Sequence, residues 1–513
     1  MVVVVAAVDV AAVVAVVAVA VVADVVAAVV VVGNQSRTKS MTKSMTAIGL
    51  GYRPELALYI ERREDLGFVE ILAEDYHSPS CVPDALKTLA QRGVEIIVHC
   101  TSLNLGGTEP VDLKMVKHID ALARYFESPF VSDHVAFVRA GGLESGHLLP
   151  VPRNQVALDL LTRNVAQAKE HLSVPLVLEN IATTFEWPAS MQQMDEADFL
   201  TELLRRTDCQ FLLDVSNLFA NSFNHKFDAV DYLKRLPLER LAYVHMAGGT
   251  FKQGLYHDTH CHPLREQSLD LLASLCQLVV PPRVMLERDD SFPPVAELTA
   301  ELDAIATVCA SARADLEMER RDDRSRGVKD DCAEIEIESK SKSEIDLEIE
   351  GHSDLASMEA AQQAMLRALI VDVAQEASNL SGIKPELLEQ AHQSLIRKRL
   401  RTMRRSCPYL VELFDDEAAL DQALRDFYKV MPSPSASGPY TDAMHFVLYL
   451  HEHKEQYAAA SKITKADLST ARAAVDSKTA KESIAAKDSK TGHDGDSKLD
   501  YFYRALRKVR LMR

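Results

Sequence analysis

The chain has 513 residues, of which 47% are hydrophobic, and a formal net charge of −18 at pH 7. This length leaves room for a large core and for roughly two to four domains. The acidic balance argues against the broad basic face that binding to nucleic-acid phosphates requires, so we expect no nucleic-acid partner. The eight cysteines include no CxxC pair, which favours reduced thiols in the cytoplasm over a disulfide framework.

A low-complexity leader is predicted for residues 1–46. Residues 1–32 are almost only Val and Ala, interrupted by Asp9 and Asp24. The longest uninterrupted apolar run, residues 10–23, is short for a bilayer span, and no basic segment precedes it as it would in a secretory signal. We therefore expect no membrane partner, with a membrane-associated segment as the alternative.

Short apolar runs alternate with longer amphipathic stretches from residue 47 onward. Continuous apolar runs are typical of strands in a parallel sheet that is covered on both faces. The predicted strands are residues 47–51, 68–73, 95–99, 130–134, 174–179, 210–214, 241–245 and 283–287, and helical spacing lies between them, as in residues 111–126, 155–171 and 195–206. Eight strand–helix units indicate an α/β fold, a (β/α)8 TIM barrel over residues 47–315. A doubly wound open sheet is the alternative.

The composition changes after the predicted barrel. Residues 316–356 are dense in charge and cannot build a core, so we predict an acidic linker there. Helical periodicity returns in residues 357–460, which predicts a small all-α domain with helices at 358–378, 384–401, 409–413, 418–431 and 441–456. Residues 461–513 are predicted to be a flexible tail that ends in a short basic helix.

Side chains of metal-ligand type follow almost every predicted strand. A single Asp at a strand end more often caps the next helix, and a single His is more often hydrogen-bonded to the backbone. Carboxylates gathered at the partly buried end of a barrel would repel one another, and cations remove that penalty. The joint pattern therefore predicts a site for two or more metal ions, and mixed imidazole and carboxylate ligands suit iron, manganese or zinc. The residues are Glu74, Asp75, His99, Asp133, His134, Glu179, Asn180, Asp214, His245, Asp258, His260, His262, Glu287 and Asp289.

Ten short motifs in this region resemble, in order, the multinuclear non-heme iron-dependent oxidative enzymes (MNIO), typified by the methanobactin-biosynthesis oxidase. The resemblance extends over residues 47–305 and implies a barrel with two or three irons. It also implies the use of dioxygen to modify residues, often cysteines, of ribosomally made peptides, with a partner protein that holds the peptide leader. The motifs are EILAEDY (70–76), HCTSLNLG (99–106), VSDH (131–134), LPVP (149–152), LEN (178–180), LDVSNL (213–218), NHKFD (224–228), VHMAG (244–248), DTHCHP (258–263) and LERD (286–289).

The resemblance also implies which residues bind iron. Two departures favour two irons over three: residues 49–55 lack the histidine that many members carry there, and Asp133 stands where some members have Glu. Asp214, His245 and Glu179 are the predicted catalytic residues. The implied ligands are His99, Asp133, Glu179, Asp214, His245, Asp258, His260 and Glu287, with His134 and Asn180 as adjacent candidates.

The helical segment at residues 357–460 resembles partner domains found beside such enzymes. We therefore predict a fused partner domain and a Cys-containing precursor peptide as the substrate. Two other functions stay open at this point: a metal-dependent isomerase or hydrolase on the same barrel, and a non-enzymatic metal-binding scaffold. Redox-active iron would favour the oxidase, whereas zinc or magnesium would favour hydrolysis or isomerisation.

Overall fold

The computed structural model describes residues 46–325, except His77, and residues 352–472, except 372, 377–378, 381, 408, 415, 432–438, 466 and 470. The described residues from Ala47 onward belong to one compact unit. Nearly all of the predicted leader and most of the predicted linker and tail lie outside the described residues. Their boundaries stay predictions.

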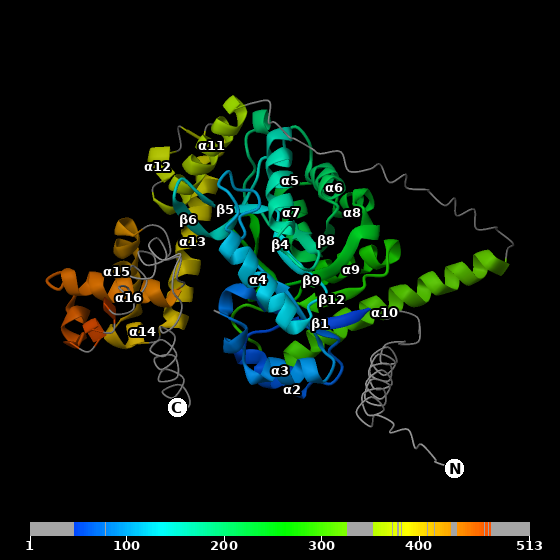
Figure 1. Ribbon diagram of the computed structural model, residues 1–513, viewed down its shortest axis with the longest axis horizontal. Coiled ribbons are helices and arrows are strands. Elements are labelled where there is room, and N and C mark those ends of the chain that lie inside the picture. Colours follow the sequence, from blue (N-terminus) through cyan, green and yellow to red (C-terminus); the bar gives the residue numbers. More distant parts are fainter. Residues whose placement is uncertain are drawn as a thin grey trace, which may run out of the picture. The chain divides into compact units, whose positions relative to one another are not determined.

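Eight parallel strands close into a barrel, which confirms the predicted TIM-barrel fold (Figure 1). Around the barrel the order is β1, β12, β9, β8, β7, β4, β3 and β2. Each strand begins and ends within about two residues of its predicted bounds, because a continuous apolar run marks a strand that is buried on both faces. The strands are β1 (Ala47–Gly51), β2 (Phe68–Leu72), β3 (Glu95–His99), β4 (Val131–His134), β7 (Leu176–Glu179), β8 (Gln210–Asp214), β9 (Leu241–Met246) and β12 (Arg283–Leu286).

Helices surround the strands (Figure 1). Asp112, Asn154 and Asp195 begin three of these helices, and each side chain accepts a hydrogen bond from a backbone N–H of the first turn. Such caps satisfy N–H groups that have no partner within the helix. The helices are α2 (Ala57–Arg62), α3 (Asp84–Gln91), α4 (Leu113–Phe126), α5 (Gln155–Lys169), α6 (Glu196–Thr207), α7 (Val215–His225), α8 (Ala229–Arg235), α9 (Glu266–Leu278) and α10 (Val295–Ser325).

The period-two alternation of the strands places polar side chains directly beyond an apolar layer. One buried apolar cluster consists of Phe68, Ile97, Phe130, Val177, Leu212, Ala242, Tyr243 and Met285. Gly49 leaves room for this layer, because a Cβ at residue 49 would lie 2.5 Å from the ring of Phe68. Residues two positions apart on a strand face the same side. Two residues after members of this cluster come Glu70, His99, Glu179, Asp214, His245 and Glu287.

Two antiparallel hairpins interrupt the strand–helix alternation, and the sequence did not predict them. One, β5 (Ala136–Ala140) with β6 (Leu143–Pro150), follows β4, and the other, β10 (Gly249–Lys252) with β11 (Leu255–Asp258), follows β9. Most of these strands lack the continuous apolar run that marks the barrel strands. A turn at Gly141 and Gly142 joins β5 to β6, with φ angles of 61° and 73° that favour glycine.

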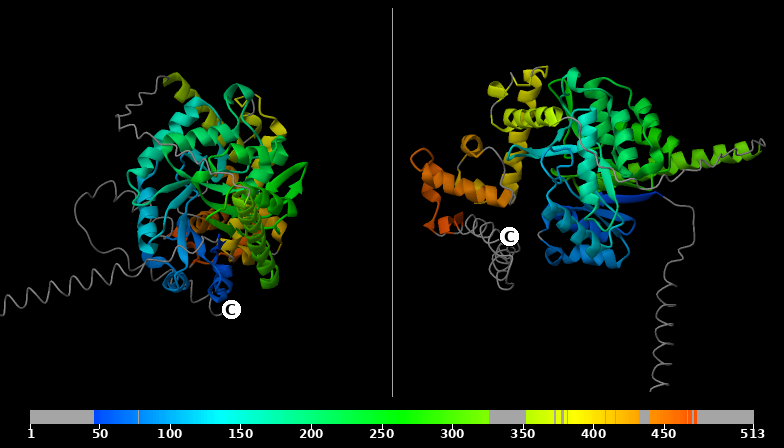
Figure 2. Two further views of the ribbon diagram at one scale, coloured as in Figure 1. Left: turned by 90° about the vertical axis from the view of Figure 1, so that its right-hand side faces the viewer. Right: turned by 45° about the horizontal axis from the view of Figure 1, so that its top comes forward.

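The C-terminal helices divide between two hydrophobic cores. Buried side chains of α11 and the first half of α13, including Met365 and Leu388, belong to the same core as the barrel, and both helices contact β6. The end of α13 packs with α14, α15 and α16 in a second core. The predicted helical character is confirmed, and Figure 2 gives two further views of these helices. They are α11 (His352–Ile370), α12 (Val373–Glu376), α13 (Pro385–Ser406), α14 (Tyr409–Leu413), α15 (Glu417–Val430) and α16 (Pro439–Glu452).

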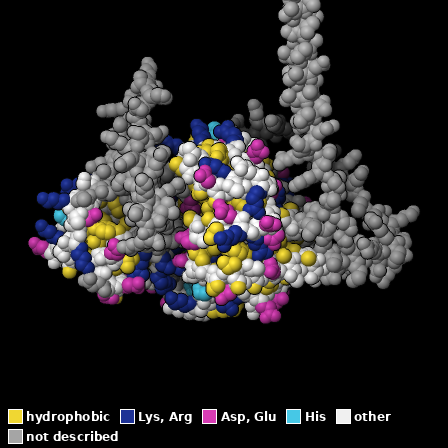
Figure 3. Space-filling model, turned by 90° about the horizontal axis from the view of Figure 1, so that it is seen from below, with side chains coloured by type: hydrophobic (Ala, Val, Ile, Leu, Met, Phe, Trp, Pro, Cys, Tyr) yellow, Lys and Arg dark blue, Asp and Glu magenta, His cyan; other side chains and the backbone are white. Residues whose placement is uncertain are grey.

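Helix α10 is 31 residues long and continues to Ser325, into the segment predicted to be a linker. None of the helices in the described part of the chain combines the length and the apolar content needed to cross a lipid bilayer. On the face drawn in Figure 3, acidic and basic side chains are interspersed.

Candidate metal centre

Seven side chains, six at the carboxyl ends of the barrel strands and one from the loop after β11, form three neighbouring groups that could hold metal ions. Within each group the candidate ligand atoms all lie within 4.8 Å of one another, which suits donors around a single ion. Glu179 and Asp214 each belong to two groups, so these carboxylates would bridge adjacent ions. The groups are His99 with His134 and Glu179, Glu179 with Asp214 and His245, and Asp214 with His260 and Glu287.

Glu179, the last residue of β7, presents its two oxygens to different groups. Its Oε2 lies 2.9 Å from Nε2 of His134 and 3.5 Å from Nε2 of His99. Its Oε1 lies 3.4 Å from Nδ1 of His245. The geometry is therefore that of a bridging carboxylate between the first two groups.

Asp214, the last residue of β8, divides its oxygens between a helix cap and the site. Its Oδ1 accepts hydrogen bonds from the backbone N–H of Ser216 at 2.7 Å and of Asn217 at 2.8 Å, which caps α7. Its Oδ2 is buried without a hydrogen-bond partner in the described part of the chain. Helix capping and metal binding, which are alternatives for most strand-end aspartates, are compatible at this residue.

The third group gathers around Glu287, which directly follows β12. Its Oε2 lies 3.2 Å from Nδ1 of His245 and 3.2 Å from Nδ1 of His260. The other nitrogen of His260, Nε2, contacts Asp258. His260 comes from the loop after β11, so a hairpin inserted in the barrel supplies part of this group.

Several donor atoms of these groups are buried without a hydrogen-bond partner among the described residues. One is Oδ2 of Asp214. Oε2 of Glu179, Nδ1 of His245 and Nδ1 of His260 make only the ion-pair contacts described above. An unsatisfied buried polar atom costs about 1–3 kcal/mol. Cations would satisfy all of these atoms, and no thiolate belongs to the three groups. The residues therefore fit a metal centre of the imidazole and carboxylate type.

Protons balance the charges of this centre when no cation is bound. Burial lowers the pKa of His134, but the carboxylate of Glu179 outweighs burial and raises that pKa to about 10. Burial, with the neighbouring charge of Asp258, raises the pKa of Asp214 to about 8. Burial raises the pKa of Glu179, but His134 and His245 bring it below its usual range. At pH 7 a metal must therefore displace protons from His134 and Asp214.

A buried hydrogen-bond chain orients two of the histidines. Nδ1 of His99 lies 2.8 Å from the hydroxyl of Ser132, which lies 2.6 Å from the hydroxyl of Tyr243. Tyr243 donates to Oε2 of Glu70 at 2.8 Å, and the same oxygen lies 2.9 Å from Nε2 of His245. These contacts occupy one nitrogen of each ring and leave Nε2 of His99 and Nδ1 of His245 facing Glu179.

Glu70 was missed as a site residue by sequence reasoning. The signal was present, because residue 70 is a carboxylate in the middle of an apolar strand and is 1% exposed.

Arg53 was missed as well. Its guanidinium contacts Glu287 at 3.2 Å and also pairs with Asp289, although residues 49–55 were noted only for lacking a histidine.

Three predicted ligands lie beside the three groups but not within them. Asp133 accepts hydrogen bonds from the backbone N–H of Leu103 and of His134. The side chain of Asn180 bonds to the backbone N–H and carbonyl of Asp214, and Asp258 contacts His260. As placed, these side chains hold the candidate ligands in position, and a direct metal contact from them stays a prediction.

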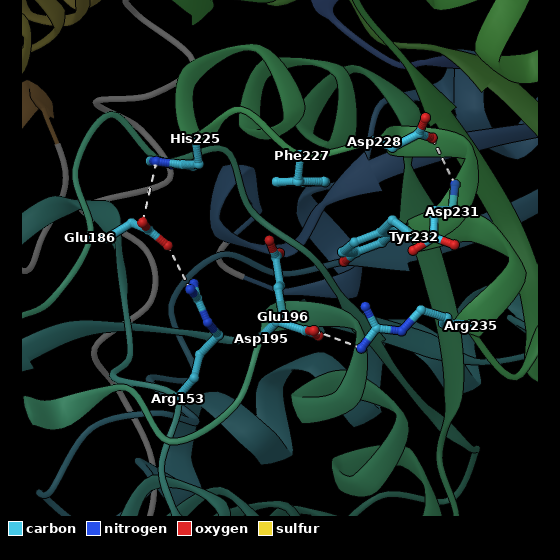
Figure 4. Close-up of a pocket in the computed structure, with 10 residues that line it drawn as sticks. All are labelled: Arg153, Glu186, Asp195, Glu196, His225, Phe227, Asp228, Asp231, Tyr232 and Arg235. Atoms are coloured by element: carbon cyan, nitrogen blue, oxygen red, sulfur yellow. Dashed lines mark hydrogen bonds and ion pairs between the residues drawn. The ribbon is translucent and has the colours of Figure 1, made fainter. Parts of the chain in front are cut away.

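The loop after β7 is anchored beside a small cavity of about 120 Å³ (Figure 4). In this cavity Glu186 lies between Arg153, whose Nη2 is at 2.5 Å, and His225, whose Nδ1 is at 3.8 Å. Ile181 and Phe185 of the same loop line the cavity at the metal centre. The ion pair of Arg153 with Glu186 therefore helps to hold in place a loop that shapes the site.

A second cavity, of about 460 Å³, lies over the metal centre. It is lined by His99, His134 and Glu179, by the loops after the strands, and by residues of β6, α11 and α13. The candidate ligands thus face a space large enough for a peptide side chain, and the C-terminal helices form part of its wall.

The fold and this site define a TIM barrel with a candidate multinuclear metal centre. The chain belongs to the RiPP precursor modification enzyme family MbnB/TglH/ChrH, whose family model matches residues 47–310. This match confirms the resemblance seen in the motifs.

Relatives and solved structures extend the comparison. A UPF0276 protein of Streptomyces avermitilis is 44% identical over 264 residues, which are 50% of this chain and 54% of that protein. A UPF0276 protein of Bordetella bronchiseptica is 37% identical over 268 residues, 51% of this chain and 92% of that protein. The chain thus spans about half the length of the Streptomyces relative.

The barrel also overlaps solved structures at low identity. One is a structure of L-ribulose 3-epimerase, with a TM-score of 0.36 and 16% identity over 56% of this chain and 99% of that one. Another is endonuclease IV from Thermus thermophilus, with a TM-score of 0.35 and 16% identity over 52% of this chain and 99% of that one. Such low scores carry no argument about function.

Proposed function

We propose that this chain uses iron and dioxygen to modify cysteine residues of a ribosomally made precursor peptide. The observation that supports this most is the row of three ligand groups joined by Glu179 and Asp214, in a chain that belongs to a family of precursor-modifying enzymes. Bound iron would supply the redox chemistry with dioxygen, which protein side chains cannot supply themselves.

The donor set favours iron over a structural zinc. Each group combines imidazole with carboxylate, whereas structural zinc sites are commonly built on cysteines. The sequence favoured two ions. We now propose up to three, because Asp214, His260 and Glu287 form a third group without a histidine from residues 49–55.

The side chains of the chain would position the ions and the substrate. Glu179 and Asp214 would keep neighbouring ions close, and Glu70 would hold His245 in the tautomer that turns Nδ1 towards Glu179. Arg53 balances the charge of Glu287 and Asp289. The cavity above these ligands would admit the peptide and limit access of water.

We further propose that the helices within residues 357–460 act as a fused partner that presents the peptide. In support, α11 and α13 share the barrel core, and α13 lines the cavity over the ligands. A peptide held by these helices would be at high local concentration beside the site. We also propose the domain boundaries predicted from the sequence and a cytoplasmic location.

Metal content and turnover test the proposal. The full chain, purified without oxygen, should contain two to three irons and should consume dioxygen when a cysteine-containing peptide is added, with a mass change in that peptide. Zinc or magnesium in place of iron, with no activity after iron loading, would contradict the oxidase and favour a metal-dependent isomerase or hydrolase.

A further inference from the structure

One face of α13 lines the cavity over the candidate metal centre. The residues of this face recur at the spacing of a single helical side. Across the same cavity lie His99, His134, Glu179, His260 and Glu287 of the ligand groups. A substrate bound at the metals would therefore touch this helix. The residues that α13 contributes are Ala391, Ser394, Leu395, Lys398, Arg401 and Thr402.

Lys398 is a cation in this cavity without an ion-pair partner. No carboxylate of the described residues lies within 4.0 Å of its ammonium. Desolvation in the cavity lowers the pKa of Lys398, and the more distant charges of Asp289 and Glu287 oppose that shift. Arg53 already pairs with both of those carboxylates. Lys398 is therefore not required to neutralise either carboxylate, and its charge is available to a bound ligand.

Arg401 lies one turn further along the same face. Its side chain is 52% exposed, and its guanidinium is 4.0 Å from Asp290 and 3.9 Å from Sγ of Cys261. These contacts are long for hydrogen bonds, so the guanidinium keeps donors for another partner.

We propose that Lys398 and Arg401 form an anion subsite that holds a carboxylate of the substrate opposite the metals. The chemistry that fits is a carboxylate within one or two residues of the reacting cysteine. Its source is either the C-terminal carboxylate of a peptide or an acidic side chain next to the cysteine. The inference rests on the proposed thiol substrate, and it assigns part of the substrate specificity to a helix outside the barrel.

Binding of three small thiols to the zinc-loaded full chain tests the subsite without redox turnover. N-acetylcysteine carries a C-terminal carboxylate, N-acetylcysteine amide carries none, and N-acetyl-aspartyl-cysteine amide carries an acidic side chain. Isothermal titration should show at least one of the two carboxylate probes binding roughly 10- to 100-fold more tightly than N-acetylcysteine amide, because a charged hydrogen bond has this strength. Which of the two binds more tightly identifies the source.

Two substitutions test whether Lys398 and Arg401 cause the preference for a carboxylate. Lys398→Met and Arg401→Leu should each reduce the preference for the carboxylate, and the double variant should abolish it, with the affinity for the amide and the metal content unchanged. Lys429→Met on α15 removes the same charge outside the cavity and should keep the preference. Equal affinities in the parent chain, failure of all probes to bind, or a preference that survives the double variant would overturn the subsite. Failure of the oxidase proposal would appear separately, as iron-loaded chain that consumes no dioxygen with any probe.

Discussion

Glu179 is the residue whose loss should affect two metal groups together, because each of its oxygens faces a different set of histidines. Glu179→Gln keeps the volume and removes the charge. We expect metal affinity to fall by more than roughly 10- to 100-fold, the range for partners that do not themselves touch a metal. Metal content per chain measures this. Glu266→Gln, at an exposed position of α9, is the control, and full metal content in Glu179→Gln would contradict the bridging role.

Glu70 acts on the centre through His245 and not by direct membership of a ligand group. Glu70→Gln replaces an acceptor oxygen with an amide and should weaken metal binding by about 10- to 100-fold. Tyr243→Phe removes only the hydroxyl that donates to Glu70, so its effect should be smaller. Competition with a coloured chelator gives both affinities. Equal losses in the two variants would mean that general packing is responsible, not the orientation of His245.

Glu196 in the small cavity beside the loop after β7 predicts a dependence of stability on pH. Burial raises its pKa from 4.5 to about 7, so the folded state holds a proton that the unfolded state releases. The stability from this proton is complete below about pH 4.5 and is lost as pH rises towards 7. Glu196→Gln should therefore raise the free energy of unfolding by about 1–3 kcal/mol at pH 8. At pH 4.5 it should change little. Urea unfolding at both values measures this, and the same effect at both would contradict the raised pKa.

At the scale of elements, one buried polar side chain hydrogen-bonds α11 to the loop after β3. Gln362 is 0% exposed, donates to the carbonyl of Gly106 at 2.7 Å and accepts from the N–H of Thr108 at 3.0 Å. Gln362→Ala leaves both backbone groups without this partner, at about 1–3 kcal/mol each. We expect a loss of about 2–4 kcal/mol in thermal unfolding. Gln363→Ala, which loses only a hydrogen bond to Glu359, is the matched control and should change stability by less than about 0.5 kcal/mol.

At the scale of the whole molecule, the shared core predicts that the two halves stay together when the chain is cut. Met365, Leu366, Leu369 and Leu388 are fully buried in the core that includes the barrel, and their exposure would cost about 1.5–3 kcal/mol each. A protease site placed within residues 330–345 should therefore yield fragments that elute as one species in size-exclusion chromatography. Two separate species would mean that the helices form an independent domain.

The sequence predicted the barrel and the ends of its strands because both depend on neighbouring residues. A strand buried on both faces is a continuous apolar run, and a polar residue at its end is visible from local pattern alone. His99, Glu179 and Asp214 were found in this way, each as the last residue of a strand. The β5–β6 and β10–β11 hairpins were missed, since most of their strands lack such a run.

The grouping of the ligands was decided only by the tertiary structure. Glu70 meets His245 across 175 residues of chain, Arg53 meets Glu287 across 234, and Gln362 meets Gly106 across 256. Such pairs form when the barrel closes and α11 packs against it. Local periodicity in the sequence does not indicate which strands become neighbours. The sequence therefore determined which side chains reach the end of the barrel, whereas closure of the barrel decided which of them lie close enough to share an ion.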